Sequence, residues 1–131
     1  MSRYVIRPDV AIRLARDEAV IRDEHELLAP TLLRSQVLSS LHQAVRAGEL
    51  TPQEAENALG YVRGLRMRLL GDRVLQTVAW DIAVELDLPD TYDAEYVALT
   101  RLQADALVSL DERFAQAAKR LVPVASIDDL T

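Results

Sequence analysis

The chain has 131 residues, half of them apolar, which suits one domain over residues 1–131 that buries roughly two-thirds of its unfolded surface. It has no cysteine, which excludes disulfide bonds, thiolate nucleophiles and cysteine-ligated zinc. Its net charge of −6 argues against a general polyanion binder. We expect a cytoplasmic protein without a membrane segment, because no apolar run approaches the roughly 18 residues of a membrane span.

The first part of the chain alternates short apolar runs with helical patterns. Residues 4–6 are predicted to form a buried strand, and residues 10–16 a short helix. The charged stretch 16–26 either continues that helix or forms a solvated connection. Residues 27–30 are interpreted as a short strand. Residues 31–48 are predicted to form an amphipathic helix that ends at its glycine.

The next helix has the clearest start in the sequence. Thr51-Pro52-Gln53-Glu54 forms a capping box with proline at the first helical position. Apolar residues at helical spacing then continue to about Leu70, and Gly71 is expected to end the helix. This helix and the preceding one should therefore form an αα-hairpin.

Several basic and apolar residues follow the capping box. Four arginines gather near the predicted helix end: Arg63, Arg66, Arg68 and Arg73. Exposed helix surface explains them more simply than phosphate contact. Val74 and Leu75 are assigned to a strand edge, and residues 78–86 to a helix with Trp80 in the core.

The last third of the chain is predicted to form a helix, a strand, a second helix and a second strand. Residues 92–102 and 112–120 repeat apolar residues at helical spacing, whereas 107–110 between them is a short apolar run. Residues 121–124 are predicted to form a final edge strand, followed by an acidic tail at 128–129. The alternation along the chain predicts an α/β fold with a parallel sheet of four or five strands covered by helices on both faces.

Two aspartates mark a candidate site. Asp111 follows the 107–110 strand, and ligands usually bind where the carboxyl ends of parallel strands meet the next helices. Asp93 lies in the first turn of the preceding helix and reaches the same edge only if the fold brings that turn over. The simpler interpretation is that both acids cap helices and complement the helix dipole.

Five segments in order resemble the PIN-domain toxins of the VapC type: the first strand, APTLLRSQVLSSL, TPQEA, YDAEYVAL and LVSLDERF. The similarity spans almost the whole chain and depends on the order and spacing of these pieces. It implies a PIN-like parallel sheet flanked by helices. It also implies a metal-dependent endoribonuclease that is neutralised by a cognate antitoxin and pairs as a homodimer.

The resemblance assigns site residues by position. Asp93 and Asp111 match two of the family's acids, which would hold Mg²⁺ or Mn²⁺ through hard oxygen ligands. The other two acids are replaced, the first by Arg7 and the second by Gln36. Asp9 lies two residues beyond Arg7 and either substitutes for the first acid or caps the helix that follows.

Arg7 decides whether this candidate site can bind a metal ion. A guanidinium about 4 Å from a divalent ion would cost roughly 8 kcal/mol at an effective dielectric of about 20. Either Arg7 points away, or metal binding is very weak, or Arg7 pairs with Asp93 and Asp111 in place of the ion. We prefer the third alternative, because two carboxylates at one edge need a cation.

Three functions remain open from the sequence. The first is a VapC-like endoribonuclease that still works with Asp93, Asp111 and Asp9. The second is a catalytically silent PIN-fold module that binds an antitoxin or RNA. The third is a small structural α/β domain whose acids are only caps.

Overall fold

The computed structural model describes residues 2–131. The strands are β1 (Ser2–Ile6), β2 (His25–Pro30), β3 (Met67–Leu70), β4 (Ala106–Val108) and β5 (Val124–Ala125). The α-helices are α1 (Pro8–Arg16), α2 (Leu32–Arg46), α3 (Pro52–Gly64), α4 (Arg73–Glu85), α5 (Tyr92–Gln103) and α6 (Glu112–Ala118). A short 3₁₀ helix, η1 (Ile127–Leu130), follows β5.

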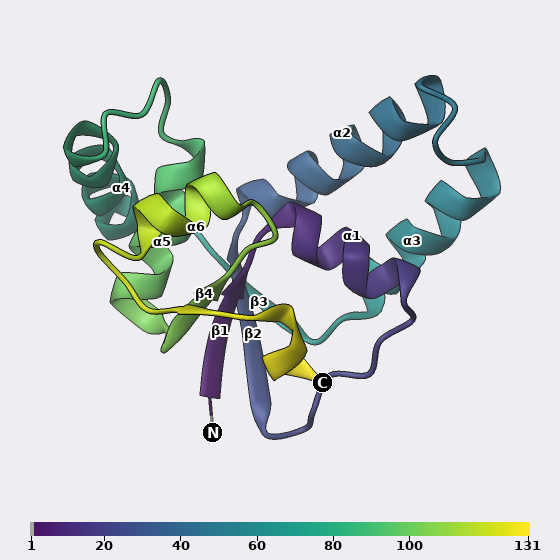
Figure 1. The fold of residues 1–131 in the computed structure, drawn as a ribbon, viewed down its shortest axis with the longest axis horizontal. Helices are drawn as coiled ribbons and strands as arrows, with labels where there is room; N and C mark the ends of the chain where they lie inside the picture. The colour runs from purple at the N-terminus through teal and green to yellow at the C-terminus, as the bar shows by residue number, and fades with distance from the viewer. Residues whose placement is uncertain (1) are drawn as a thin grey trace.

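The five strands form one sheet in the order β3-β2-β1-β4-β5, and every pair is parallel. Figure 1 shows α1, α2 and α3 on one side of the sheet and α4, α5 and α6 on the other. The predicted parallel sheet with helices on both faces is therefore confirmed. No helix within residues 2–131 is long and apolar enough to cross a bilayer.

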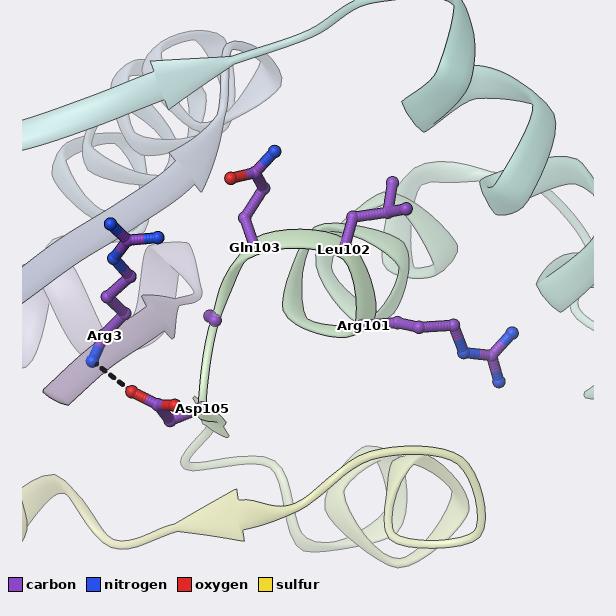
Figure 2. A pocket seen from close by; sticks show the side chains of 6 residues that line it. Arg3, Arg101, Leu102, Gln103 and Asp105 are labelled. Atoms are coloured by element: carbon purple, nitrogen blue, oxygen red, sulfur yellow. Dashed lines mark hydrogen bonds between the residues drawn. The ribbon is translucent and has the colours of Figure 1, made fainter.

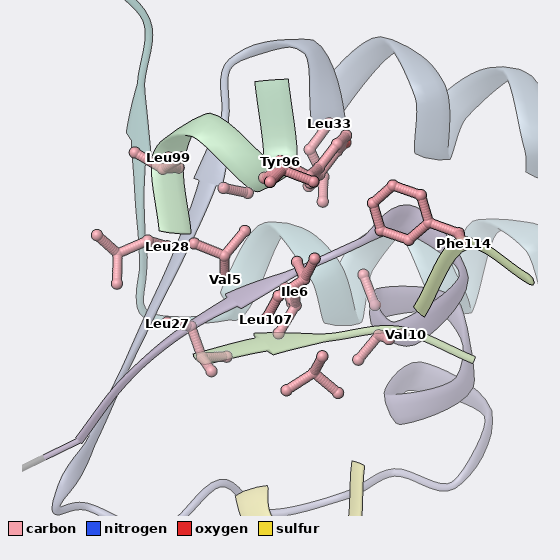
Figure 3. Close-up of a cluster of buried hydrophobic side chains, with 14 of the residues drawn as sticks. Val5, Ile6, Val10, Leu27, Leu28, Leu33, Tyr96, Leu99, Leu107 and Phe114 are labelled. Atoms are coloured by element: carbon pink, nitrogen blue, oxygen red, sulfur yellow. The ribbon is translucent and has the colours of Figure 1, made fainter. Parts of the chain in front are cut away.

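The core occupies both faces of the sheet, as expected when helices cover a parallel sheet on both sides. Figure 3 shows part of it, including Val5 and Ile6 of β1, Leu28 of β2 and Leu107 of β4, all fully buried. Val5 pairs with Leu28 on one side and with Leu107 on the other. The first strand of the chain is thus the centre of the sheet.

The strongest local signals gave the right boundaries. Thr51 caps α3 by accepting from the Glu54 backbone N–H at 3.1 Å, while Glu54 Oε1 accepts from the Thr51 backbone N–H at 2.9 Å. Gly48 follows α2 with a φ of +76°, a conformation that glycine adopts without strain. The predicted capping box and helix end are both confirmed.

The predicted helix from Pro52 to about Leu70 is wrong in its second half. α3 ends at Gly64, Leu65 is extended, and residues 67–70 form β3. The sequence of this stretch favours a helix because arginine, leucine and methionine are good helix formers. The open edge of β2 overrides that preference, since β3 pairs with it from Met67 to Leu70.

Two further predictions in this region are wrong. Val74 and Leu75 lie in α4 and not at a strand edge. Trp80 is exposed and not in the core. α4 packs mainly on α5, and its buried face carries Leu75, Ala79, Ile82 and Ala83, so Trp80 lies on the opposite, exposed side.

The four arginines also lie on different elements. Arg63 is in α3 and Arg73 begins α4, whereas Arg68 is in β3 and forms an ion pair of 3.2 Å with Glu26 of β2. They are all exposed, but they do not share one helix surface.

Candidate functional site

A surface pocket of about 430 Å³ lies at the carboxyl end of the sheet, where β1 and β4 finish. All five residues that the sequence singled out line this pocket, together with one proline, two serines and a tyrosine. The lining residues are Arg7, Pro8, Asp9, Gln36, Ser39, Ser40, Asp93, Tyr96 and Asp111. The fold thus brings the first turn of α5 to the edge where Asp111 lies, which the sequence could not establish.

A second hollow of similar volume, about 420 Å³, lies near the amino end of β1. Figure 2 shows Arg3, Arg101, Leu102, Gln103 and Asp105 around it, with the Arg3 backbone N–H donating to Asp105 at 2.8 Å. Asp105 is its one carboxylate, so this hollow offers no cluster of acids. We therefore assign the candidate site to the carboxyl edge.

The Arg7 side chain lies in the pocket between a carboxylate and two aromatic rings. Its Nη1 atom lies 3.1 Å from Oδ1 of Asp93, and its side chain is only 13% exposed. The guanidinium carbon lies 3.8 Å from the ring centre of Phe114 and 5.7 Å from that of Tyr96. The negative faces of the two rings stabilise a cation that has left water.

The contact between Arg7 and Asp93 is an ion pair without hydrogen-bond alignment. Both Nε and Nη1 of Arg7 are buried and have no hydrogen-bond partner among the described residues. The predicted pairing of Arg7 with a site carboxylate is therefore present, and its partner is Asp93. Within residues 2–131, Arg7 makes no ion pair with Asp111.

Asp9 connects the ends of two neighbouring strands. It lies in the first turn of α1, where its Oδ1 accepts from the Val10 backbone N–H at 2.8 Å. Its Oδ2 accepts from the Leu110 backbone N–H at 3.3 Å. Both carboxylate oxygens therefore already accept hydrogen bonds from the backbone. The prediction that Asp9 caps the helix is wrong, because α1 begins one residue earlier, at Pro8, and its N-cap is Arg7, whose side chain makes no capping hydrogen bond.

Asp111 is the N-cap of α6. Its Oδ1 accepts from the Phe114 backbone N–H at 3.1 Å, and its own backbone N–H donates to Ser109 Oγ at 3.0 Å. This capping bond also fixes the first turn of α6, which carries the Phe114 ring that covers Arg7. Figure 3 shows Phe114 beside the end of β1.

Gln36 of α2 accepts a hydrogen bond of 2.5 Å from the Tyr96 hydroxyl of α5. This bond joins helices from opposite faces of the sheet, and both of its residues line the pocket. Burial raises the pKa of the Tyr96 phenol above its usual range, and nearby Arg7 opposes that shift. Tyr96 is therefore a neutral donor at physiological pH, and Gln36 supplies a neutral acceptor at the position where the resemblance implies an acid.

The residues of the pocket do not fit a divalent metal ion. In the described part of the chain, no three histidine, cysteine, aspartate or glutamate side chains lie close enough to hold one. The Arg7 side chain, which is 13% exposed, already brings a positive charge within 3.1 Å of the Asp93 carboxylate that a divalent ion would need. The resemblance implied Mg²⁺ or Mn²⁺, and the donor set present here is incomplete for either.

Sequence reasoning missed the aromatic half of the site. Tyr96 follows Asp93 by three residues in α5, and Phe114 follows Asp111 by three in α6, so each ring lies one helical turn beyond an acid. This spacing was the available signal. Ser39 and Ser40 were also missed, although they follow Gln36 by three and four residues in α2 and therefore share its face.

No protein-family model and no curated protein matches the sequence. Among solved structures, the chain is similar to PAE2754 from Pyrobaculum aerophilum, with a TM-score of 0.75 and 21% identity over 98% of this chain and 91% of that one. It is also similar to VapBC2 from Rickettsia felis bound to a DNA fragment from their promoter, with a TM-score of 0.69 and 8% identity. That match covers 95% of this chain and 98% of the other. At these identities the similarity establishes the fold, which is PIN-like.

Proposed function

We propose that this chain is a catalytically silent PIN-like protein of the toxin-antitoxin type, which acts in the cytoplasm by binding a cognate antitoxin. The observation that carries the proposal is the ion pair of 3.1 Å between Arg7 and Asp93. The similarity to a VapBC complex supports an antitoxin as the partner. We extend the proposal to a homodimer, as the family resemblance implies.

The catalytic silence follows from charge. A divalent ion about 4 Å from the Arg7 guanidinium would be repelled by roughly 8 kcal/mol at an effective dielectric of about 20. Gln36 contributes no negative charge to offset that repulsion. Asp9 and Asp111 accept hydrogen bonds from backbone N–H groups, so their role in this chain is to hold the strand and helix ends together.

Calorimetric titration tests the loss of the metal site. Mg²⁺ and Mn²⁺ are titrated into the wild type, Arg7→Asp, Gln36→Glu and the double variant. We expect no specific binding to the wild type, weak binding to either single variant and the tightest binding to the double variant, because it regains two carboxylates and loses the cation. Wild-type binding as tight as that of the double variant would overturn the proposal.

Co-expression tests the antitoxin. The chain is produced with the product of the reading frame beside its own gene, and the complex is isolated through a tag on that product. We expect a stable complex whose formation is unchanged in Asp93→Asn, since binding does not depend on catalysis. Absence of any complex would leave the PIN-like fold without this function.

A metal-dependent endoribonuclease is the second candidate, favoured by one observation. Asp9, Asp93 and Asp111 line the same pocket, as a working site of this family would require. Purified protein is incubated with RNA and Mg²⁺, beside an Asp93→Asn variant prepared identically. Cleavage by the wild type that the variant lacks would establish this candidate in place of catalytic silence.

A further inference from the structure

A cavity of about 780 Å³ lies beside the last turns of α3, and it shares no lining residue with the candidate site. It is bounded by residues 19–23 of the loop after α1, by the first residues of β2 and β3, and by the end of α3. We call it the α3 cavity. It opens at the amino edge of the sheet, opposite the carboxyl edge where the candidate site lies, and its volume is typical of pockets that hold small organic molecules.

The inner walls of the α3 cavity are apolar. Ile21 of the loop, Leu27 of β2 and Met67 of β3 line it, together with Tyr61 of α3. The Tyr61 hydroxyl donates to the Ala19 carbonyl at 2.5 Å, so the hydroxyl is already paired and the ring is left as carbon surface. The body of a molecule that fits these walls is therefore apolar.

One wall is flat because two residues of α3 have no side chain. Gly60 and Gly64 lie about one turn apart, both are exposed and both line the cavity. A Cβ atom at either position would meet nothing within 4 Å, and neither glycine has a positive φ, so the backbone does not require glycine there. The effect of the two glycines is to leave room for a planar ring against the helix.

Arg66 carries a charge that is not balanced inside the described chain. Arg68 pairs with Glu26 at 3.2 Å, and Arg22 pairs with a neighbouring glutamate. Within residues 2–131, Arg66 forms no ion pair. These three arginines line the cavity against two acids, Asp23 and Glu26, so positive charge is in excess there although the whole chain carries −6. A carboxylate matches the paired N–H donors of a free guanidinium.

His25 adds an unsatisfied donor to the same cavity. It lines the cavity, and both of its ring nitrogens are buried without a hydrogen-bond partner among the described residues. An imidazole ring carries at least one N–H group in either protonation state, and a buried N–H without an acceptor is rare. An acceptor on a bound molecule would satisfy it.

We infer that the α3 cavity binds a small aromatic carboxylate. The carboxylate lies between Arg66 and His25, and the ring packs on α3 at the two glycines. This site goes beyond the proposed function and does not depend on it, because it contains no residue of the candidate site. For a ligand of about a dozen heavy atoms we expect a dissociation constant on the order of 0.1–1 mM.

A titration followed by NMR tests the site. Naphthalene-2-carboxylate is added to ¹⁵N-labelled protein, and the neutral naphthalene-2-carboxamide is the matched compound. The chain has four glycines, of which Gly60 and Gly64 line the cavity and Gly48 and Gly71 do not. We expect saturable shifts of the Gly60 and Gly64 amides, and binding of the carboxamide that is about threefold to fivefold weaker. No saturable shift at these two glycines, or equal affinity for the two compounds, would overturn the inference.

The two histidines of the chain extend this test. The ring nitrogens of His25 should shift as the carboxylate is added, whereas those of His42, which is exposed and outside the cavity, should not. If the His25 ring does not respond, the carboxylate lies elsewhere and the inference is wrong.

Substitutions in α3 test the room beside the glycines. Gly60→Leu fills this room and should remove the binding, while leucine favours the helix and should keep the protein folded, as circular dichroism checks. Gly64→Ala is a smaller change on the same wall and should weaken the binding. Gln53→Leu, at an exposed position of α3 outside the cavity, is the matched control and should bind as the wild type does. Wild-type affinity in both glycine variants would contradict the assigned position of the ring.

Charge substitutions test the position of the carboxylate. Arg66→Gln should remove the preference for the carboxylate over the carboxamide, because it removes the charge that distinguishes the two compounds. Arg63→Gln, at an exposed arginine of α3 outside the cavity, is the matched control and should keep the preference. Asp23→Asn should tighten carboxylate binding about twofold, because it removes a like charge from the rim. A preference that survives Arg66→Gln overturns the inference.

Discussion

The two residues of the Arg7–Asp93 ion pair differ in how far their side chains are exposed to solvent. Arg7 is 13% exposed, whereas Asp93 is 43% exposed. The Asp93→Asn variant leaves the guanidinium buried without a counter-charge, and we expect it to lower the free energy of unfolding by about 1–2 kcal/mol. Chemical denaturation measures the difference.

Asp111→Asn is the matched control for that variant. It also removes one negative charge from the pocket, but asparagine caps a helix almost as well as aspartate, so the expected loss is under about 0.5 kcal/mol. If both variants lower the free energy of unfolding by the same amount, the Arg7–Asp93 ion pair does not contribute measurably to stability.

Glu54 makes stability depend on pH in the acid range. Its hydrogen bonds with Thr51 hold the pKa of the Glu54 carboxyl below the usual value of 4.5. Because the folded pKa is lower than the unfolded one, its contribution is fully present above the unfolded pKa and is lost as the pH falls through the folded pKa. Glu54→Gln should therefore flatten the pH dependence of unfolding below about pH 5, the region of the unfolded carboxyl pKa.

Urea unfolding of the wild type and Glu54→Gln between about pH 3 and 6 measures this effect across the carboxyl range. Glu56→Gln, at an exposed glutamate of the same helix, serves as the comparison. A wild type and a Glu54→Gln variant with the same acid slope would contradict the role assigned to the capping box.

The identity of the site residues was more predictable than their surroundings. The resemblance assigned Arg7, Asp93 and Asp111 to one site, so a pairing of Arg7 with these carboxylates could be predicted. The sequence could not show that Asp93 alone is the partner. The Phe114 and Tyr96 rings could not be placed around Arg7, because that depends on how α5 and α6 are oriented in three dimensions. Sequence spacing shows which residues share one face of a helix, but it does not show which part of the molecule that face contacts.

Among the secondary-structure elements, η1 shows that the segment after β5 is anchored and not a loose acidic tail. Ser126 caps it, and the Leu130 carbonyl accepts from the Arg22 backbone N–H at 3.1 Å. The Leu130 side chain is fully buried. Leu130→Ala should therefore lower the free energy of unfolding by about 2–4 kcal/mol.

Thermal and chemical denaturation check this prediction. Leu110→Ala is the comparison, because Leu110 is 40% exposed and its truncation should cost clearly less. If the two truncations cost the same, the last turn of the chain does not contribute to the core.

Elements with strong local signals were predictable, and β3 was not. The capping box and Gly48 fix helix ends through the chemistry of a few neighbouring residues. β3 exists because β2 has an open edge, and its partners lie about forty residues earlier in the chain, as with Leu28 and Arg68. The prediction that Trp80 lies in the core was wrong for a related reason, since the exposure of this side chain depends on how α4 packs against α5. Non-local packing decided each element that the sequence did not reveal.

For the whole molecule, the buried residues form one continuous core that includes both helical layers. We therefore expect the two layers to unfold together, in a single urea transition followed by far-ultraviolet circular dichroism and by amide hydrogen exchange. Two separated transitions would show that the layers are independent. Trp80 emission should change little in the monomer, because its ring is exposed before unfolding as well as after it.

The central position of β1 has a consequence for synthesis on the ribosome. β1 pairs with β2 early, but its other edge must wait for β4, which begins at Ala106. At about 5–20 residues per second, the nascent chain carries this half-sheet for roughly a few seconds after β3 emerges. During that interval the unpaired edge of β1 is a template for wrong strand pairing. Translation pauses between Leu70 and Ala106 should therefore lower the soluble yield more than pauses after Ala125.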